Sequence, residues 1–275
     1  MLLTKTYRKL TKLKHKKGKH FMYSKPQVIF SVKTLDDQIN ILTEFLKTDE
    51  DLNATVANYI LTNLGIEKKE LIGKTEQERK EIIKNFVTPI YNIKQNQMKK
   101  KVEEYQTFWN ENERFVCLEF EKIFKIAFKG IRRFNAQVNL NPVNPRYLSE
   151  DAFDVFYIKK KEEVLEVCIH ELIHFYWFQL FSEYYPEIST DKFESPHVEW
   201  LLSEIAVDPI IYFSKLREVC SVRPAYDVFY ETKINDESVI NFFRKLYKSN
   251  NFENFLIKSL KFLNENKQLV EKLVK

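Results

Sequence analysis

The segment from Lys161 to Phe181 constrains the fold of this chain most, because it is apolar on nearly every side once its charged first turn has passed. An amphipathic surface helix leaves a polar stripe, and this segment leaves almost none. Lysines and glutamates mark a solvated start, and Tyr185 followed by Pro186 marks the end. The sequence therefore predicts a long helix that is buried in the protein core.

Three of the few polar side chains in this apolar helix belong to the sequence HELIH from His170 to His174. Histidines four residues apart lie about 40° from each other around a helix of roughly 3.6 residues per turn, so both imidazoles can reach one metal ion. Glu171 lies between them and stays free to take a proton from a water that the metal activates. Since a buried polar group without a partner costs roughly 2 to 7 kcal/mol, a metal accounts for this motif better than an ordinary core helix does.

A catalytic zinc site normally takes three protein ligands and leaves one position for water. We expect the third ligand in a second helix, from about Pro196 to Val219, where Glu204 and Asp208 lie four residues apart on one face. Apolar neighbours crowd Glu204 on both sides, which favours a paired carboxylate over a solvated one. Other residues in or just before this helix also qualify as the third ligand: His197, Glu199, Asp191 and Glu194.

The HExxH motif at His170 and the ExxxD motif at Glu204 together resemble those of the gluzincin metallopeptidases. The resemblance is limited to the metal-site region, from the strand before the first motif to the end of the second helix. It implies that His170, His174 and Glu204 bind Zn²⁺. It further implies that Asp208 orients a metal-binding histidine from outside the ligand set. By the same resemblance, Glu171 would be the general base in the hydrolysis of a peptide bond, and the substrate would be a peptide or a protein.

Amide hydrolysis by such a site also needs an electrophile that stabilises the developing oxyanion. Tyr226 is the residue that we assign to this catalytic role. Three other residues remain candidates for it: Tyr230, Arg223 and His197.

Two segments ahead of the HExxH helix have the residue types of strands. Ala152 to Ile158 is rich in aromatic and β-branched residues, and Phe134 to Leu140 ends at the turn dipeptide Asn141-Pro142. The expected fold class is therefore α+β and mostly helical, with a small sheet before the HExxH helix. The family resemblance implies that this part is a zincin-like domain and that an extended substrate lies along the edge of the sheet.

The chain divides into three predicted regions: a basic arm over residues 1–25, a helical domain over 26–115 and a gluzincin-like domain over 116–275. The arm contains nine Lys or Arg and no acid, while the whole chain has 44 basic and 39 acidic residues, so the arm carries all of the positive excess. Spacing of apolar residues predicts these helices in the other two regions: Thr34 to Lys47, Asn53 to Leu64, Thr75 to Asn92, Gln95 to Trp109, Ser238 to Tyr247 and Phe252 to Val274.

The basic arm leads to an alternative function, a nucleic-acid-associated regulatory or binding protein whose metal site is structural or degenerate. The four glycines cannot form a phosphate-binding loop, a dinucleotide fingerprint or a nucleophile elbow, which excludes kinase, P-loop and serine-hydrolase chemistry. The first 25 residues are not expected to form a secretory signal, and no apolar run in the sequence reaches membrane-spanning length. Three unclustered cysteines, Cys117, Cys168 and Cys220, are expected to be free thiols in a reducing cytoplasm.

Overall fold

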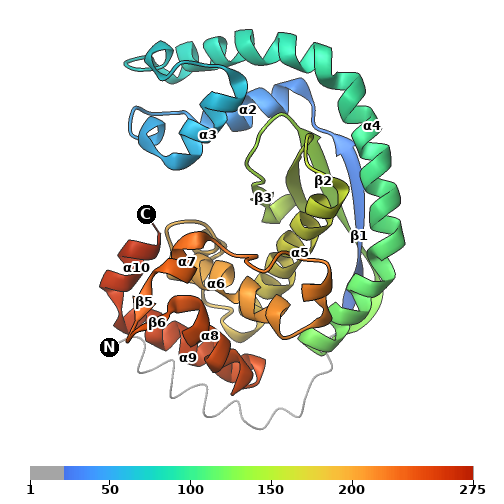
Figure 1. The fold of residues 1–275 in the computed structure, drawn as a ribbon, viewed down its shortest axis with the longest axis vertical. Coiled ribbons are helices and arrows are strands. Elements are labelled where there is room, and N and C mark those ends of the chain that lie inside the picture. Colours follow the sequence, from blue (N-terminus) through green and yellow to red (C-terminus); the bar gives the residue numbers. More distant parts are fainter. Residues whose placement is uncertain (1–21, 275) are drawn as a thin grey trace.

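The computed structural model describes residues 22–274, which form a mostly helical α+β structure with one four-stranded sheet (Figure 1). The coarse fold class predicted from the sequence is therefore confirmed. Most of the basic arm lies outside the described residues. The structure therefore does not test the predicted role of the arm in nucleic-acid binding.

The four-stranded sheet precedes the HExxH helix along the chain. Its order is β1-β2-β4-β3, with β1, β2 and β4 parallel and the short β3 antiparallel at one edge. The two predicted strands correspond to β2 and β4. The strands span Met22–Val32 (β1), Ala127–Asn139 (β2), Arg146–Tyr147 (β3) and Ala152–Phe156 (β4), and a separate hairpin consists of Lys233–Ile234 (β5) and Glu237–Ser238 (β6).

Strand β1 lies partly in the region that the sequence predicts to be helical, so that prediction is wrong for residues 26–32. Val28 and Phe30 are buried and Ile29 is exposed, which is the alternation of a strand. The partner of β1 is β2, with Val28 opposite Phe134. A strand whose hydrogen bonds depend on a segment so distant in sequence is poorly indicated by its own residues.

Helix α4 (Glu76–Phe124) is a single helix of 49 residues where the sequence predicts two, and it continues across the boundary predicted at residue 115. It starts with a capping box in which Thr75 and Glu78 satisfy each other's backbone N–H groups. Pro89 lies inside it without ending it. The helix follows the outer side of the molecule along β1 (Figure 1) and also contacts α5. Two shorter helices precede it, α2 (Leu35–Phe45) and α3 (Thr55–Leu64).

Helix α5 (Lys161–Tyr184) is the buried helix that the sequence predicts. Helix α6 packs against it and is shorter than predicted, since it ends at Tyr212. The predicted last helix is divided in two at Asn266. The helices after α5 are α6 (Val198–Tyr212), α7 (Asp227–Glu231), α8 (Val239–Lys248), α9 (Phe252–Glu265) and α10 (Lys267–Leu273), and short 3-10 helices cover Asp51–Asn53, Lys68–Glu70, Leu148–Glu150, Thr190–Phe193 and Lys215–Glu218.

One continuous apolar core connects the sheet, α4, α5 and the C-terminal helices. All three cysteines are free, with Cys117 and Cys168 buried and Cys220 half-buried. Over residues 22–274, no helix combines the length and the apolar character needed to cross a membrane.

Candidate metal centre

Helices α5 and α6 bring together the three residues predicted as metal ligands. The Nε2 atoms of His170 and His174 are 3.0 Å apart, and Glu204 Oε2 lies 3.5 Å from the first and 3.3 Å from the second. His174 and Glu204 are buried, and the His170 side chain is 22% exposed. Thus one side of the cluster remains accessible.

The spacing of these three atoms fits a single tetrahedral metal ion. With bonds of about 2.0 to 2.2 Å and tetrahedral angles, neighbouring ligand atoms are separated by roughly 3.3 to 3.6 Å. The three separations in the cluster are close to this value. Among the described residues, no other set of three or more His, Cys, Asp or Glu converges in this way.

The charges in the cluster suit metal binding. Burial, the largest influence, lowers the pKa of His174 to about 3, so its imidazole is neutral at pH 7. At His170, the hydrogen bond to Glu204 and the charges of Glu171 and Glu204 outweigh burial and raise the pKa. Burial opposes the charge of Glu204, but the two histidines and Arg146 hold its pKa well below the ordinary value. The cluster therefore contains one ionised carboxylate and at least one imidazole lone pair.

Glu171 lies between the two histidines and has the properties expected of a proton acceptor. Its side chain is buried, and its Oε2 atom has no hydrogen-bond partner within residues 22–274. Burial, partly offset by His170 and Arg146, raises the pKa of Glu171 to about 7. A carboxylate with a pKa near neutrality can both take up and release a proton.

Arg146 is part of this site, although the sequence gives no sign of it. The residue belongs to β3, and its Nη1 atom donates to Glu204 Oε1 at 2.9 Å. Both side chains are almost completely buried, with exposures of 8% and 2%. No motif identifies Arg146, because β3 is only two residues long and its position depends on pairing with β4.

Asp208 does not make the contact predicted for it. Its carboxylate accepts from Arg244 Nε at 2.6 Å and Nη2 at 2.8 Å, and from the Tyr230 hydroxyl at 2.5 Å. The Nδ1 atom of His174 is buried and has no hydrogen-bond partner in the part of the chain that the structure describes. Sequence spacing places Asp208 on the same helix face as Glu204, but α7 and α8 supply the groups that its carboxylate binds.

Tyr226 caps the N-terminus of α7 and is half-exposed. The negative charge of Glu204 raises its pKa more than any other influence, so its ring lies within electrostatic range of the cluster. Its hydroxyl has no hydrogen-bond partner among the described residues. The alternative candidates are engaged elsewhere: Tyr230 donates to Asp208, and Arg223 pairs with Asp227 at 3.2 Å.

The other candidates for the third ligand lie outside the cluster. His197 is the N-cap of α6, Glu199 is in the first turn of that helix, and Asp191 pairs with the neighbouring Lys192. Glu194 has a pKa raised by burial and lies near Arg146, whose charge opposes this rise.

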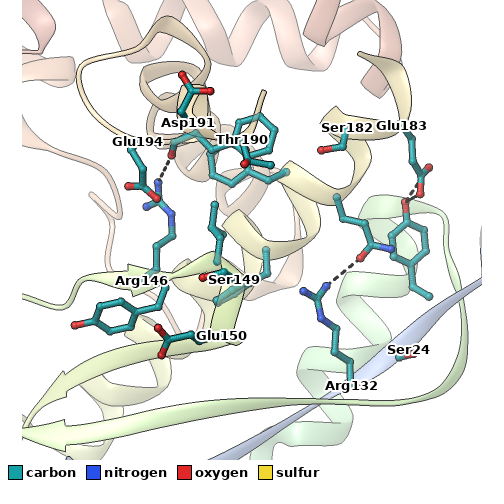
Figure 2. A pocket seen from close by; sticks show the side chains of 17 residues that line it. Ser24, Arg132, Arg146, Ser149, Glu150, Ser182, Glu183, Thr190, Asp191 and Glu194 are labelled. Atoms are coloured by element: carbon teal, nitrogen blue, oxygen red, sulfur yellow. Dashed lines mark hydrogen bonds between the residues drawn. The ribbon is translucent and has the colours of Figure 1, made fainter. Parts of the chain in front are cut away.

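A groove of about 1120 Å³ adjoins the cluster on the side of Arg146. Figure 2 shows Arg146 and Ser149 facing Thr190 and Glu194 across it, with Arg132 further along. Phe178 contributes to its wall and also stacks on His174, with ring centroids 6.2 Å apart. The groove and the cluster thus share the walls formed by Arg146 and Phe178.

Comparisons of the chain with protein-family models, with curated proteins and with solved structures found no match in any of the three. The function must therefore be inferred from the site itself.

Proposed function

We propose that the protein is a zinc-dependent peptidase of gluzincin type, with His170, His174 and Glu204 as metal ligands. The observation that carries the proposal is the convergence of their Nε2, Nε2 and Oε2 atoms beside the unpartnered carboxylate oxygen of Glu171. Two imidazoles and one carboxylate are the ligands of a known class of catalytic zinc sites. A zincin-like domain is the fold that this proposal implies.

Zn²⁺ at this position would act as a Lewis acid that lowers the pKa of a water molecule and polarises the carbonyl of the substrate. Glu171 takes the proton from that water at its carboxylate and then passes it to the leaving amine. The Tyr226 hydroxyl has no other partner among the described residues, and it would donate to the carbonyl oxygen as negative charge develops there. Arg146 and Phe178, which line the groove, also contact Glu204 and His174 and so connect the groove with this chemistry.

A polypeptide is the substrate class that suits the groove. Its volume of about 1120 Å³ exceeds the roughly 300 to 1000 Å³ of sites for small ligands. Polar and aromatic side chains both line it, so peptide backbone and side chains would each find contacts. The short edge strand β3 forms part of one wall, and a sheet edge can pair with an extended chain.

The substitution Glu171→Gln tests the proposal most directly. Glutamine preserves size and polarity but cannot accept the proton, so we expect hydrolysis of a peptide library to fall by about 10²- to 10⁴-fold. The zinc content, measured by mass spectrometry after reconstitution, should stay near one ion per chain in both proteins.

Glu199→Gln is the matched control, because Glu199 lies in α6 outside the cluster. It should cleave the library like the wild-type protein. Equal cleavage by the wild type and Glu171→Gln would contradict the role of Glu171. A folded wild-type protein that binds no zinc would contradict the metal centre itself.

A further inference from the structure

The two oxygens of Glu204 have different partners. Oε2 faces the two histidine Nε2 atoms, while Oε1 accepts from Arg146 Nη1 at 2.9 Å. A carboxylate can bind a metal through one oxygen or through both. With Oε1 held by a buried guanidinium, only Oε2 is directed towards the cluster.

Arg146 is itself held by several elements. Strand pairing with β4 places its backbone opposite Phe153. Its Nη2 atom donates to the carbonyl of Phe193 at 3.3 Å, and its guanidinium lies 5.4 Å from the centre of the Phe178 ring. Phe178 in turn stacks on His174. The guanidinium is therefore fixed against both the carboxylate ligand and a ring that supports a histidine ligand.

A positive charge at this place has two opposite effects on metal binding. Its repulsion weakens the binding of a divalent cation, whereas its hydrogen bond fixes the direction of Glu204. Residues that hydrogen-bond to a metal ligand without binding the metal themselves typically contribute about 10- to 100-fold to metal affinity. The planar guanidinium donates to Glu204 and to the carbonyl of Phe193 at once. This fixed geometry favours the orienting effect over the repulsion of the cation.

We propose that Arg146 is a positioning residue that holds Glu204 as a one-oxygen ligand and keeps the three ligands assembled when no metal is bound. This inference rests on the proposed metal centre. It assigns a role to β3, since the strand delivers a residue that the helices carrying the ligands do not contain.

The experiment compares Arg146→Ala, Arg146→Lys and the wild type by their cobalt(II) absorption spectra and by zinc competition against a chelator. For Arg146→Ala we expect a loss of zinc affinity of about 10- to 100-fold and a changed cobalt spectrum, because Glu204 can then turn. Lysine restores the charge but not the two directed hydrogen bonds, so Arg146→Lys should keep the altered spectrum.

Arg132→Ala is the control, since Arg132 also borders the groove and pairs with a carboxylate, that of Asp151. Its cobalt spectrum and zinc affinity should equal those of the wild type. If Arg146→Ala matches the wild type in both measurements, the positioning role is wrong while the metal centre stands. If the folded wild-type protein binds neither metal, the metal centre and this inference both fail.

A double variant covers the case in which Arg146→Ala folds but is too unstable for the metal measurements. Loss of the arginine leaves Glu204 charged and buried, and Glu204→Gln removes that charge. The variant Arg146→Ala with Glu204→Gln should therefore melt at a higher temperature than Arg146→Ala alone, in the presence of chelator. An equal or lower melting temperature would contradict the proposed pairing in the metal-free protein.

Discussion

Glu204 and Asp208 lie on one face of α6, yet they have separate electrostatic partners. Glu204 faces two imidazoles and Arg146, and Asp208 accepts from Arg244 and Tyr230. Each buried carboxylate needs a cation or several donors to remain ionised. The Asp208 carboxylate therefore connects α6 with α7 and α8, and the Glu204 carboxylate is the one that faces the histidines.

We expect Asp208→Ala to reduce stability more than metal binding. Removing one partner of a buried ion pair costs about 3 to 5 kcal/mol, and the partial exposure of Arg244 favours the lower end of that range. The free energy of unfolding in urea measures the loss. Zinc content should stay near one ion per folded chain.

Glu265→Ala serves as control for Asp208→Ala, because Glu265 pairs with Lys261 on the exposed surface. Little change in stability is expected there. Loss of zinc from Asp208→Ala without a loss of stability would instead support an orienting contact with a histidine.

At the scale of elements, one buried carboxylate connects three parts of the sheet. Asp154 in β4 accepts from Lys33 Nζ, just after β1, at 2.7 Å and from the Tyr147 hydroxyl of β3 at 3.2 Å. Its side chain is fully buried. Burial is the largest influence on the pKa of Asp154 and raises it from 3.8 to about 6, although Lys33 and Tyr147 oppose the rise.

Because the folded state binds this proton more tightly than the unfolded chain, Asp154 stabilises the fold most at pH values below about 4. This contribution decreases as pH rises and is lost above about pH 6, and its upper limit is roughly 3 kcal/mol. In Asp154→Asn the unfolding free energy should fall less between pH 4 and pH 6 than it does in the wild type. Urea unfolding with chelator present, at both pH values, measures this difference. An identical fall in both proteins would mean that Asp154 does not titrate in this range.

At the scale of the whole molecule, segments distant in sequence form one groove beside the candidate metal centre. Tyr23 and Ser24 of β1, Arg132 of β2, the β3 segment, α5 and the loop before α6 all contribute to it. Figure 1 shows α4 and β1 on one side of α5 and the C-terminal helices on the other. The groove therefore forms only when the sheet, α5 and the loop before α6 pack together.

If substrate lies in this groove, a bulky side chain there should weaken substrate binding. Ser182 of α5 lines the groove, and we expect Ser182→Trp to raise KM for cleaved peptides by about tenfold or more, which corresponds to ~1.4 kcal/mol. The zinc content should not change. Ser249→Trp, on the exposed end of α8, is the control. An unchanged KM for Ser182→Trp would place the substrate elsewhere.

The sequence alone predicts the features that depend on local geometry. A helical repeat of roughly 3.6 residues brings His170 and His174 to one face, and the apolar surroundings of α5 require that this face be buried. The same reasoning predicts a helix that contains Glu204, but the choice of Glu204 over His197, Glu199, Asp191 and Glu194 as third ligand comes from the resemblance to gluzincins. The residue types of β4 and the mostly helical class follow from local composition as well.

Tertiary packing decides the features that depend on distant partners. Strand β1 needs β2 as a partner for its backbone hydrogen bonds. Asp208 pairs with Arg244 because the packing of α8 brings that side chain next to it. Arg146 reaches Glu204 because β3 pairs with β4, a contact that leaves no periodic pattern in the sequence. Local spacing can select a ligand set, but the groups that orient it come from separate elements, and only the packed fold brings them within hydrogen-bonding distance.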